Sequence, residues 1–309
     1  MKTQAMLQTF QQPLPHGITL SCRATGARGR PVLMFLHGFP EAAFVWDALL
    51  EHFAQPENGG YRCVAPNLRG YEKSSAPSEV SAYRAKFLIQ DIAALIAIET
   101  AQIDSQAGGQ LDCLVAHDWG GAVAWGLANQ LPHLTKKLAI INSPHPGTFL
   151  RELKSNPKQQ AASAYMNFLI RADAEQILLE DDCRRLFEFF TNMGGQSWLT
   201  EPIKQQYREV WTSSLTGGCN YYRASPLRPP TPQDPGAAAI ELPRSMLTVD
   251  IPTLVIWALD DIALPPELIE GLGDYIPHLS LKKVAGATHW IIHEQPELVA
   301  GYLGDFLKP

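Results

Sequence analysis

The sequence lacks the cysteine patterns that stabilise small secreted domains or bind zinc. Its 309 residues include five cysteines, an odd number, at widely spaced positions with no Cys-x-x-Cys pair: Cys22, Cys63, Cys113, Cys183 and Cys219. Such spacing argues against both a disulfide framework and a zinc site. We therefore expect reduced, mostly buried thiols and no metal ion.

Runs of one charge and long apolar runs are also missing. The formal net charge is −6, and the 25 basic and 31 acidic residues are scattered, which argues against nucleic acid or an anionic membrane surface as the main partner. No run approaches the ~20 apolar residues that a membrane helix needs, and the first residues contain no apolar segment of signal-peptide length. We expect a cytoplasmic enzyme that acts on a small neutral molecule.

The residues that are present indicate a globular α/β enzyme. Of the chain, 46% is hydrophobic and 18% charged, which is enough to bury a sizeable core. Short apolar runs, typical of strands buried on both faces, alternate with longer helical patterns. The predicted strands are 32–36, 62–65, 113–116, 138–142, 253–258 and 279–284, and the predicted helices are 83–100, 122–130 and 296–307. This alternation predicts a mostly parallel central sheet flanked by helices.

Between residues 144 and 249 the alternation stops. Strand-like runs are missing there, and helical stretches at 159–170, 183–192 and 203–214 precede a proline- and glycine-rich loop at 226–243. We interpret 144–249 as a helical cap inserted into a sheet domain formed by 1–143 and 250–309. A cap over the carboxyl ends of the strands would close an apolar pocket where open α/β sheets bind their ligands.

Asp118 lies in a segment typical of a nucleophile elbow, a sharp turn between a strand and a helix that exposes a catalytic side chain. The segment 111–121 reads Leu-Asp-Cys-Leu-Val-Ala-His-Asp-Trp-Gly-Gly, with small residues two positions before and after Asp118. A serine that attacked a saturated carbon would leave an ether, whereas a carboxylate leaves an ester that water can cleave. An aspartate at this position therefore indicates hydrolysis at an sp3 carbon, as in an epoxide or a carbon–halogen bond.

Two later loops provide the acid and the base that this nucleophile requires. The acid and then the histidine should follow the nucleophile, each after a later strand. Asp260 and Asp261 follow the fifth predicted strand, and His289 follows the sixth. An imidazole with a near-neutral pKa suits a general base. A metal pair of His289 and His293 is disfavoured, because no HExxH pattern or further ligand cluster accompanies it.

The turn after the first predicted strand, His37-Gly38-Phe39-Pro40, provides a candidate oxyanion donor. The backbone amides of Phe39 and Trp119 are suited to stabilise the oxyanion that forms when water attacks an Asp118 ester. Pro40 has no amide N–H, and its ring helps to hold the turn rigid. The alternative is a simple turn at the end of a strand.

With these motifs the chain resembles the α/β-hydrolase superfamily, and within it the epoxide hydrolases. The resemblance extends from Leu36 to the C-terminus and rests on the motifs at 37–41, 68–71, 116–121, 142–146, 220–223 and 286–289. It implies an α/β-hydrolase core formed by 1–143 and 250–309. The triad acid of the family stands four residues after a strand tryptophan. Asp261 stands at that distance from Trp257, which favours it over Asp260.

The resemblance also implies a pair of cap tyrosines that hydrogen-bond the epoxide oxygen and protonate it as the ring opens. Tyr222, in Asn-Tyr-Tyr-Arg, is the closer match, and Tyr165 is the expected second member. A phenol with a pKa near 10 stays protonated at neutral pH and can still share its proton with a developing alkoxide. The residues after Tyr165 depart from the family pattern, so the register of that helix is open.

The expected reaction opens a small apolar epoxide to a vicinal diol. Asp118 attacks one epoxide carbon while Tyr165 and Tyr222 hold the oxygen, and His289, oriented by Asp261, then activates water to cleave the ester. No metal ion or organic cofactor is required. The preferred epoxide, the attacked carbon, the stereochemistry and the oligomeric state, including a possible homodimer, are open at this stage.

Two alternatives remain at the level of sequence. A haloalkane or haloacid dehalogenase could use the same nucleophile on an organohalide, with the indole N–H of Trp119 donating to the leaving halide. A second halide donor is not identifiable, however, and Trp119 stands where a fluoroacetate dehalogenase would carry arginine. The other alternative is a non-catalytic hydrolase-like ligand-binding protein, which would not need nucleophile, acid, base and tyrosines together.

Overall fold

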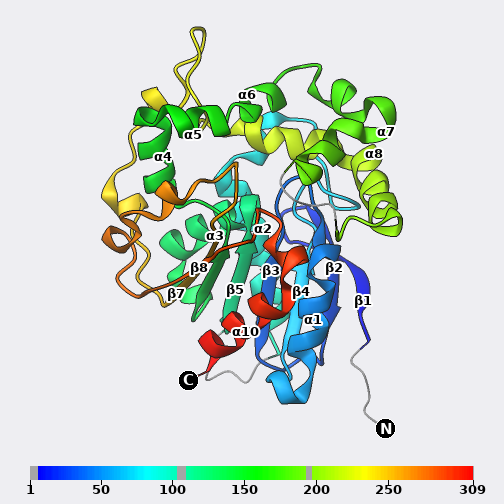
Figure 1. Cartoon of the computed structure of the whole chain (residues 1–309). Helices are drawn as coiled ribbons and strands as arrows, with labels where there is room; N and C mark the ends of the chain where they lie inside the picture. The colour runs from blue at the N-terminus through cyan, green and yellow to red at the C-terminus, as the bar shows by residue number, and fades with distance from the viewer. Residues whose placement is uncertain (1–5, 103–108, 193–196, 309) are drawn as a thin grey trace.

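An eight-stranded sheet forms the centre of the protein, for which a computed structural model describes residues 6–102, 109–192 and 197–308 (Figure 1). The strand order is β1-β2-β4-β3-β5-β6-β7-β8. The strands are β1 (Gln8–Pro13), β2 (Thr19–Thr25), β3 (Val32–Leu36), β4 (Arg62–Pro66), β5 (Cys113–His117), β6 (Leu138–Ile141), β7 (Thr253–Ala258) and β8 (Leu279–Val284). β1 and β2 are antiparallel to their neighbours, and β3 to β8 pair in parallel. The predicted α/β fold with a mostly parallel sheet is confirmed.

All six strands predicted from apolar runs are present, each within one residue of its predicted bounds. The prediction that all six are buried on both faces is wrong for β8. This strand is at the edge of the sheet, and only Val284 of its six residues is buried. The sequence analysis also missed β1 and β2, because β1 is polar and exposed and does not show a continuous apolar run.

Helices cover both faces of the sheet. α1 (Asp47–Ala54), α9 (Ile291–Glu294) and α10 (Pro296–Leu307) pack on one face, where Leu33, Phe35 and Val115 contribute to the core. α2 (Ala85–Thr100) and α3 (Asp118–Gln130) pack on the other face, where Met34 and Leu114 contribute. Because neighbouring residues of a strand point to opposite faces, continuous apolar runs supply both layers.

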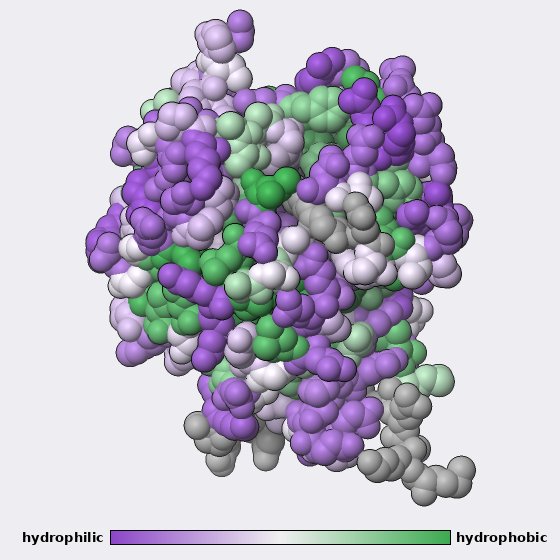
Figure 2. Space-filling view, in the orientation of Figure 1, coloured by the Kyte–Doolittle hydropathy of each residue, from purple (hydrophilic) through white to green (hydrophobic). Residues whose placement is uncertain are grey.

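The segment between β6 and β7 is helical and lies at one end of the sheet (Figure 1). Its helices are α4 (Pro146–Ser155), α5 (Pro157–Ala162), α6 (Tyr165–Leu169), α7 (Ala174–Thr191) and α8 (Glu201–Ala224). The prediction of a single helix at 159–170 is wrong, because the chain turns between α5 and α6. The helix predicted at 203–214 continues to Ala224. Hydrophilic residues predominate on the face of the molecule that Figure 2 shows.

The last helix of this segment, α8, is attached directly to the loops at the ends of the strands. The indole N–H of Trp211 donates to the Pro40 carbonyl at 2.7 Å, and the Tyr221 hydroxyl donates to the Arg69 carbonyl at 2.9 Å. Gly217 faces Gly70 so closely that a Cβ atom at Gly217 would lie 2.1 Å from the Gly70 carbonyl oxygen. A glycine is therefore required in the middle of this helix.

We expect Gly217→Ala to destabilise the protein by about 2 kcal/mol or more, because the added methyl group would overlap backbone atoms that cannot move aside easily. Gly301→Ala is the matched control in α10, where a Cβ atom would meet nothing within 4 Å. Its unfolding free energy should rise by up to about 1 kcal/mol, the gain in helix propensity. Urea unfolding of both variants measures the difference, and equal effects would contradict the close packing of α8.

Candidate active site

The chain makes the predicted strand–turn–helix at Asp118. β5 ends at His117, α3 begins at Asp118, and Asp118 itself has a φ of 48°, in the left-handed region that non-glycine residues rarely occupy. A Cβ atom at Gly120 would lie 2.5 Å from the Leu36 carbonyl oxygen. The glycine is thus required because α3 starts directly against the end of β3.

The Asp118 carboxylate faces two of the predicted partners. Its Oδ1 accepts a hydrogen bond from the Phe39 amide at 2.7 Å, and its Oδ2 lies 3.7 Å from Nε2 of His289. Trp119 follows in the first turn of α3, where backbone N–H groups have no acceptor within the helix. The Phe39 amide therefore contacts the carboxylate, and the Trp119 amide is free of helical hydrogen bonding.

His289 and Asp261 form a buried pair. Nδ1 of His289 lies 2.6 Å from Oδ2 of Asp261, which leaves Nε2 directed toward Asp118. Asp261 also accepts hydrogen bonds from the side chain of Asn142 and from the amides of Ala263 and Leu264. Its neighbour Asp260 is exposed. The structure brings Asp261, not Asp260, to the histidine.

The charges of this pair shift both pKa values. Burial alone would raise the pKa of Asp261, but the neighbouring His289 and the hydrogen bonds hold it below its usual value. Burial would likewise lower the pKa of His289, but the charge and hydrogen bond of Asp261, together with the charge of Asp118, raise it to about 9. Asp118 is therefore one of the groups that keep a proton on His289.

The two predicted tyrosines come together above Asp118 from different helices. Tyr165 begins α6 and Tyr222 lies in the last turns of α8, and their ring centroids are 6.0 Å apart in an edge-to-face arrangement. Burial is the main reason that the pKa of each hydroxyl lies above its usual value, and the charge of Asp118 raises it further. Both phenols thus hold their protons firmly beside the carboxylate.

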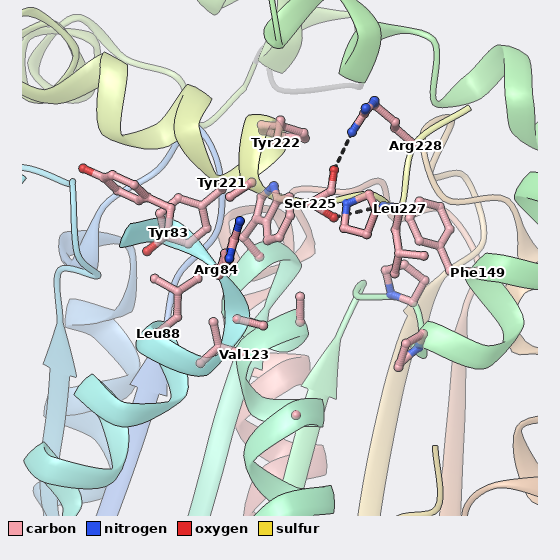
Figure 3. A pocket seen from close by; sticks show the side chains of 18 of the residues that line it. Tyr83, Arg84, Leu88, Val123, Phe149, Tyr221, Tyr222, Ser225, Leu227 and Arg228 are labelled. Atoms are coloured by element: carbon pink, nitrogen blue, oxygen red, sulfur yellow. Dashed lines mark hydrogen bonds between the residues drawn. The ribbon is translucent and has the colours of Figure 1, made fainter. Parts of the chain in front are cut away.

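Two spaces of very different size meet at Asp118. The larger has a volume of about 750 Å³ and is bounded by α2, α3, α4, α8 and the segment after α8, with Trp119, Val123 and Phe149 among its lining residues (Figure 3). The smaller has about 20 Å³, enough for one water molecule, and lies on the His289 side. Asp118, Tyr165 and Tyr222 line both spaces.

A buried polar cluster behind His289 was missed by the sequence analysis. Glu41 is fully buried, and its carboxylate lies 3.1 Å from Nδ1 of His117 and 2.7 Å from Nε2 of His293. Nε2 of His117 is 2.9 Å from the backbone carbonyl of His289, and the Tyr207 hydroxyl donates to Glu41 at 3.3 Å. The only signal in the sequence was an acidic residue within the apolar stretch after Phe39.

This cluster also accounts for His293. Burial would raise the pKa of Glu41, but hydrogen bonds and charge interactions with His117 and His293 hold it well below its usual value. His289 binds Asp261 and His293 binds Glu41, so the two histidines have separate partners. Among the described residues no group of three or more His, Cys, Asp or Glu is arranged to hold a metal ion.

Comparisons with known proteins agree with this fold. Residues 31–296 match the family model described as alpha/beta hydrolase fold. The chain is 34% identical to AB hydrolase superfamily protein YfhM of Bacillus subtilis, over 95% of this chain and 96% of that protein. It is 30% identical to Epoxide hydrolase 4 of Mus musculus, over 94% of this chain and 77% of that protein.

Solved structures give the same result. An inhibitor complex of Bacillus megaterium epoxide hydrolase superposes with a TM-score of 0.85 at 29% identity, covering 96% of this chain and 99% of the other. A structure from work on novel epoxide hydrolases in metagenomes from hot environments also has a TM-score of 0.85, at 36% identity, covering 98% and 99%. The chain belongs to the α/β-hydrolase superfamily and, within it, to the epoxide hydrolase family of enzymes.

Over the part of the chain that is described, none of the helices has the length and apolar character needed to cross a membrane.

The His289 pair predicts how stability depends on pH. The folded-state pKa of about 9 lies above the ordinary value of 6.5, so the bound proton stabilises the fold. This contribution is fully present below about pH 6.5 and is lost as the pH rises through about 9. We expect the difference in unfolding free energy between the wild type and His289→Gln to fall over this range.

Urea unfolding at a series of pH values measures this difference, and the shift in pKa corresponds to roughly 3 kcal/mol at most. Asp261→Asn is the control, because removing the carboxylate removes the main cause of the raised pKa. In that background the pH dependence should be much weaker. A difference that stays constant from pH 6.5 to 9 would show that the pair holds no additional proton.

Proposed function

We propose that this enzyme hydrolyses epoxides to vicinal diols through a covalent ester on Asp118. The observation that carries the proposal is the meeting of four groups at one cavity: the Asp118 carboxylate, the Phe39 amide, the His289–Asp261 pair and the two tyrosines. Its similarity to epoxide hydrolases of animals and bacteria supports the same substrate class.

In the first step a carboxylate oxygen of Asp118 attacks an epoxide carbon, forming a C–O ester bond as the ring C–O bond breaks. The ring oxygen takes a proton from Tyr222 or Tyr165. The charge of Asp118 is one cause of the raised pKa values of both tyrosines. Because alkylation neutralises Asp118, the phenols become better acids at the moment when the alkoxide forms.

The same loss of charge prepares the second step. Asp118 is also one cause of the raised pKa of His289, so an ester at Asp118 makes His289 lose its proton more readily. Neutral His289 then accepts a proton from water, which attacks the ester carbonyl. The Phe39 and Trp119 amides hold the oxyanion, and its collapse breaks the bond between the carbonyl carbon and the alkyl oxygen. The leaving alkoxide takes the remaining proton of the attacking water, which releases the diol and restores the carboxylate. The proton on His289 returns through solvent to the tyrosinate. None of these steps requires a cofactor.

In this proposal residues 144–249 act as the cap. This segment contributes Tyr165 and Tyr222, and further residues of it, such as Phe149 and Leu227, line the larger cavity. The cavity is lined mainly by apolar groups, which favours a small apolar epoxide over a charged one. The core segments 1–143 and 250–309 contribute the nucleophile, the acid, the base and the oxyanion donors.

We expect His289→Gln to accumulate the ester intermediate. Without a base the second step should slow by about 100-fold or more, while attack by Asp118 continues. Intact-protein mass spectrometry after incubation with styrene oxide should then show an increase equal to the mass of one epoxide. Asp118→Asn is the control and should show neither the adduct nor diol.

The same samples test the substrate class. Diol should form from aryl and alkyl epoxides with the wild type, and halide release from halogenated alkanes and acids should be negligible. Halide without diol would reject the proposal in favour of a dehalogenase. An adduct in the wild type without any turnover would instead indicate a ligand-binding protein.

The tyrosine pair gives a further prediction. Tyr222→Phe should lower the rate of alkylation by about 100-fold, the usual effect of losing one donor to a developing oxyanion. Stopped-flow tryptophan fluorescence, to which Trp119 beside Asp118 contributes, measures this step. Tyr221→Phe is the matched control, because the Tyr221 hydroxyl donates to the Arg69 carbonyl rather than facing Asp118. It should lose some stability and keep its rate, and equal rate losses in the two variants would contradict the role of Tyr222.

A further inference from the structure

The reacting centre lies between two spaces that differ greatly in volume. About 750 Å³ is open on one side of Asp118 and about 20 Å³ on the other, and both spaces reach Asp118, Tyr165 and Tyr222. We propose that the enzyme prefers epoxides whose substituents are on one ring carbon and discriminates against trans epoxides substituted on both carbons. This proposal rests on the epoxide hydrolase activity proposed above.

The larger space is suited to receive the substituent. Its lining includes the apolar side chains of Trp119, Phe149, Met166, Leu227 and Leu264. A volume of this order is typical of pockets for whole small molecules. A phenyl or alkyl group attached to one epoxide carbon therefore fits here while the ring itself lies under the tyrosines.

The smaller space has aromatic walls. Trp290 is almost fully buried and contacts Phe190 at 4.5 Å and His289 at 4.7 Å between ring centroids. Phe189 packs edge-to-face against Phe39 at 6.2 Å and against Tyr165 at 5.8 Å. A second substituent would have to displace one of these rings, and close-packed surroundings resist such displacement.

Hydrolysis of the ester, the second step of the proposed reaction, gives an independent reason why a second substituent is disfavoured in the smaller space. The smaller space is lined by His289 and Asp118, so it is where the water that cleaves the ester can stand next to the base. A group on the second epoxide carbon would occupy the place of that water. The same compartment thus selects against doubly substituted rings and keeps the hydrolytic water in position.

Trans-substituted rings are the sensitive probe because their two groups point away from each other. With one group in the larger space, the other is directed toward Phe189 and Trp290. Groups that share one carbon both remain on the side of the larger space. Constitutional isomers with the same atoms therefore separate the geometric effect from hydrophobicity.

The experiment compares two isomers, 2-methyl-2-phenyloxirane and trans-2-methyl-3-phenyloxirane, with styrene oxide as the reference and trans-stilbene oxide as the largest member. We expect kcat/KM to favour the first isomer over the second by at least about tenfold, and trans-stilbene oxide to be converted least. Equal values for the two isomers would overturn the proposal. If the enzyme converts none of the four epoxides, the proposed function itself is rejected.

Phe189→Ala tests the wall of the smaller space directly. Removing this ring should lower the ratio of the kcat/KM values of the two isomers by about tenfold, mainly because the trans isomer is converted faster. If the alanine variant does not fold, Phe189→Leu should change the ratio in the same direction by a smaller factor. An unchanged ratio in a folded Phe189 variant would show that this ring does not set the limit.

Phe149→Ala is the matched control, the same truncation on the wall of the larger space. It should leave the preference against the trans isomer in place. A similar narrowing of the ratio in Phe149→Ala and Phe189→Ala would mean that general loosening of the site, and not the smaller space, explains the effect. The proposal would then be wrong.

Discussion

The turn at Asp118 is the constraint on which the rest of the site depends. Its φ of 48° and the contact of Gly120 with the end of β3 fix the start of α3 against the sheet. A non-glycine residue in this region costs of order 1 kcal/mol or more, and the surrounding sheet has to hold it in place. The strained turn directs the Asp118 carboxylate to the Phe39 amide and to His289.

Electrostatics connects the two proposed steps through this one carboxylate. The charge of Asp118 contributes to the raised pKa values of His289, Tyr165 and Tyr222. The pKa values of these three groups therefore need no separate adjustment for alkylation and for hydrolysis. Formation of the proposed ester changes the proton affinity of all three groups, and hydrolysis of the ester restores it.

The sequence predicted much of this arrangement because the motifs are local. The elbow at Asp118, the loops after β7 and β8 and six of the eight strands could be identified from apolar runs and turn residues. The buried cluster at Glu41 could not, because its contacts join residues up to 252 positions apart. Nor could the break between α5 and α6, since a short helix is set by its packing more than by its own residues.

The attachment of α8 to the core has a consequence for how the protein can change. Trp211, Gly217 and Tyr221 each tie α8 to loops of the sheet domain, and Tyr222 is carried by the same helix. The chain that follows, 226–246, borders the larger cavity and takes no part in these attachments. Insertions, deletions and substitutions in that stretch can therefore remodel the range of accepted molecules across evolution while the distance between phenol and carboxylate is inherited unchanged.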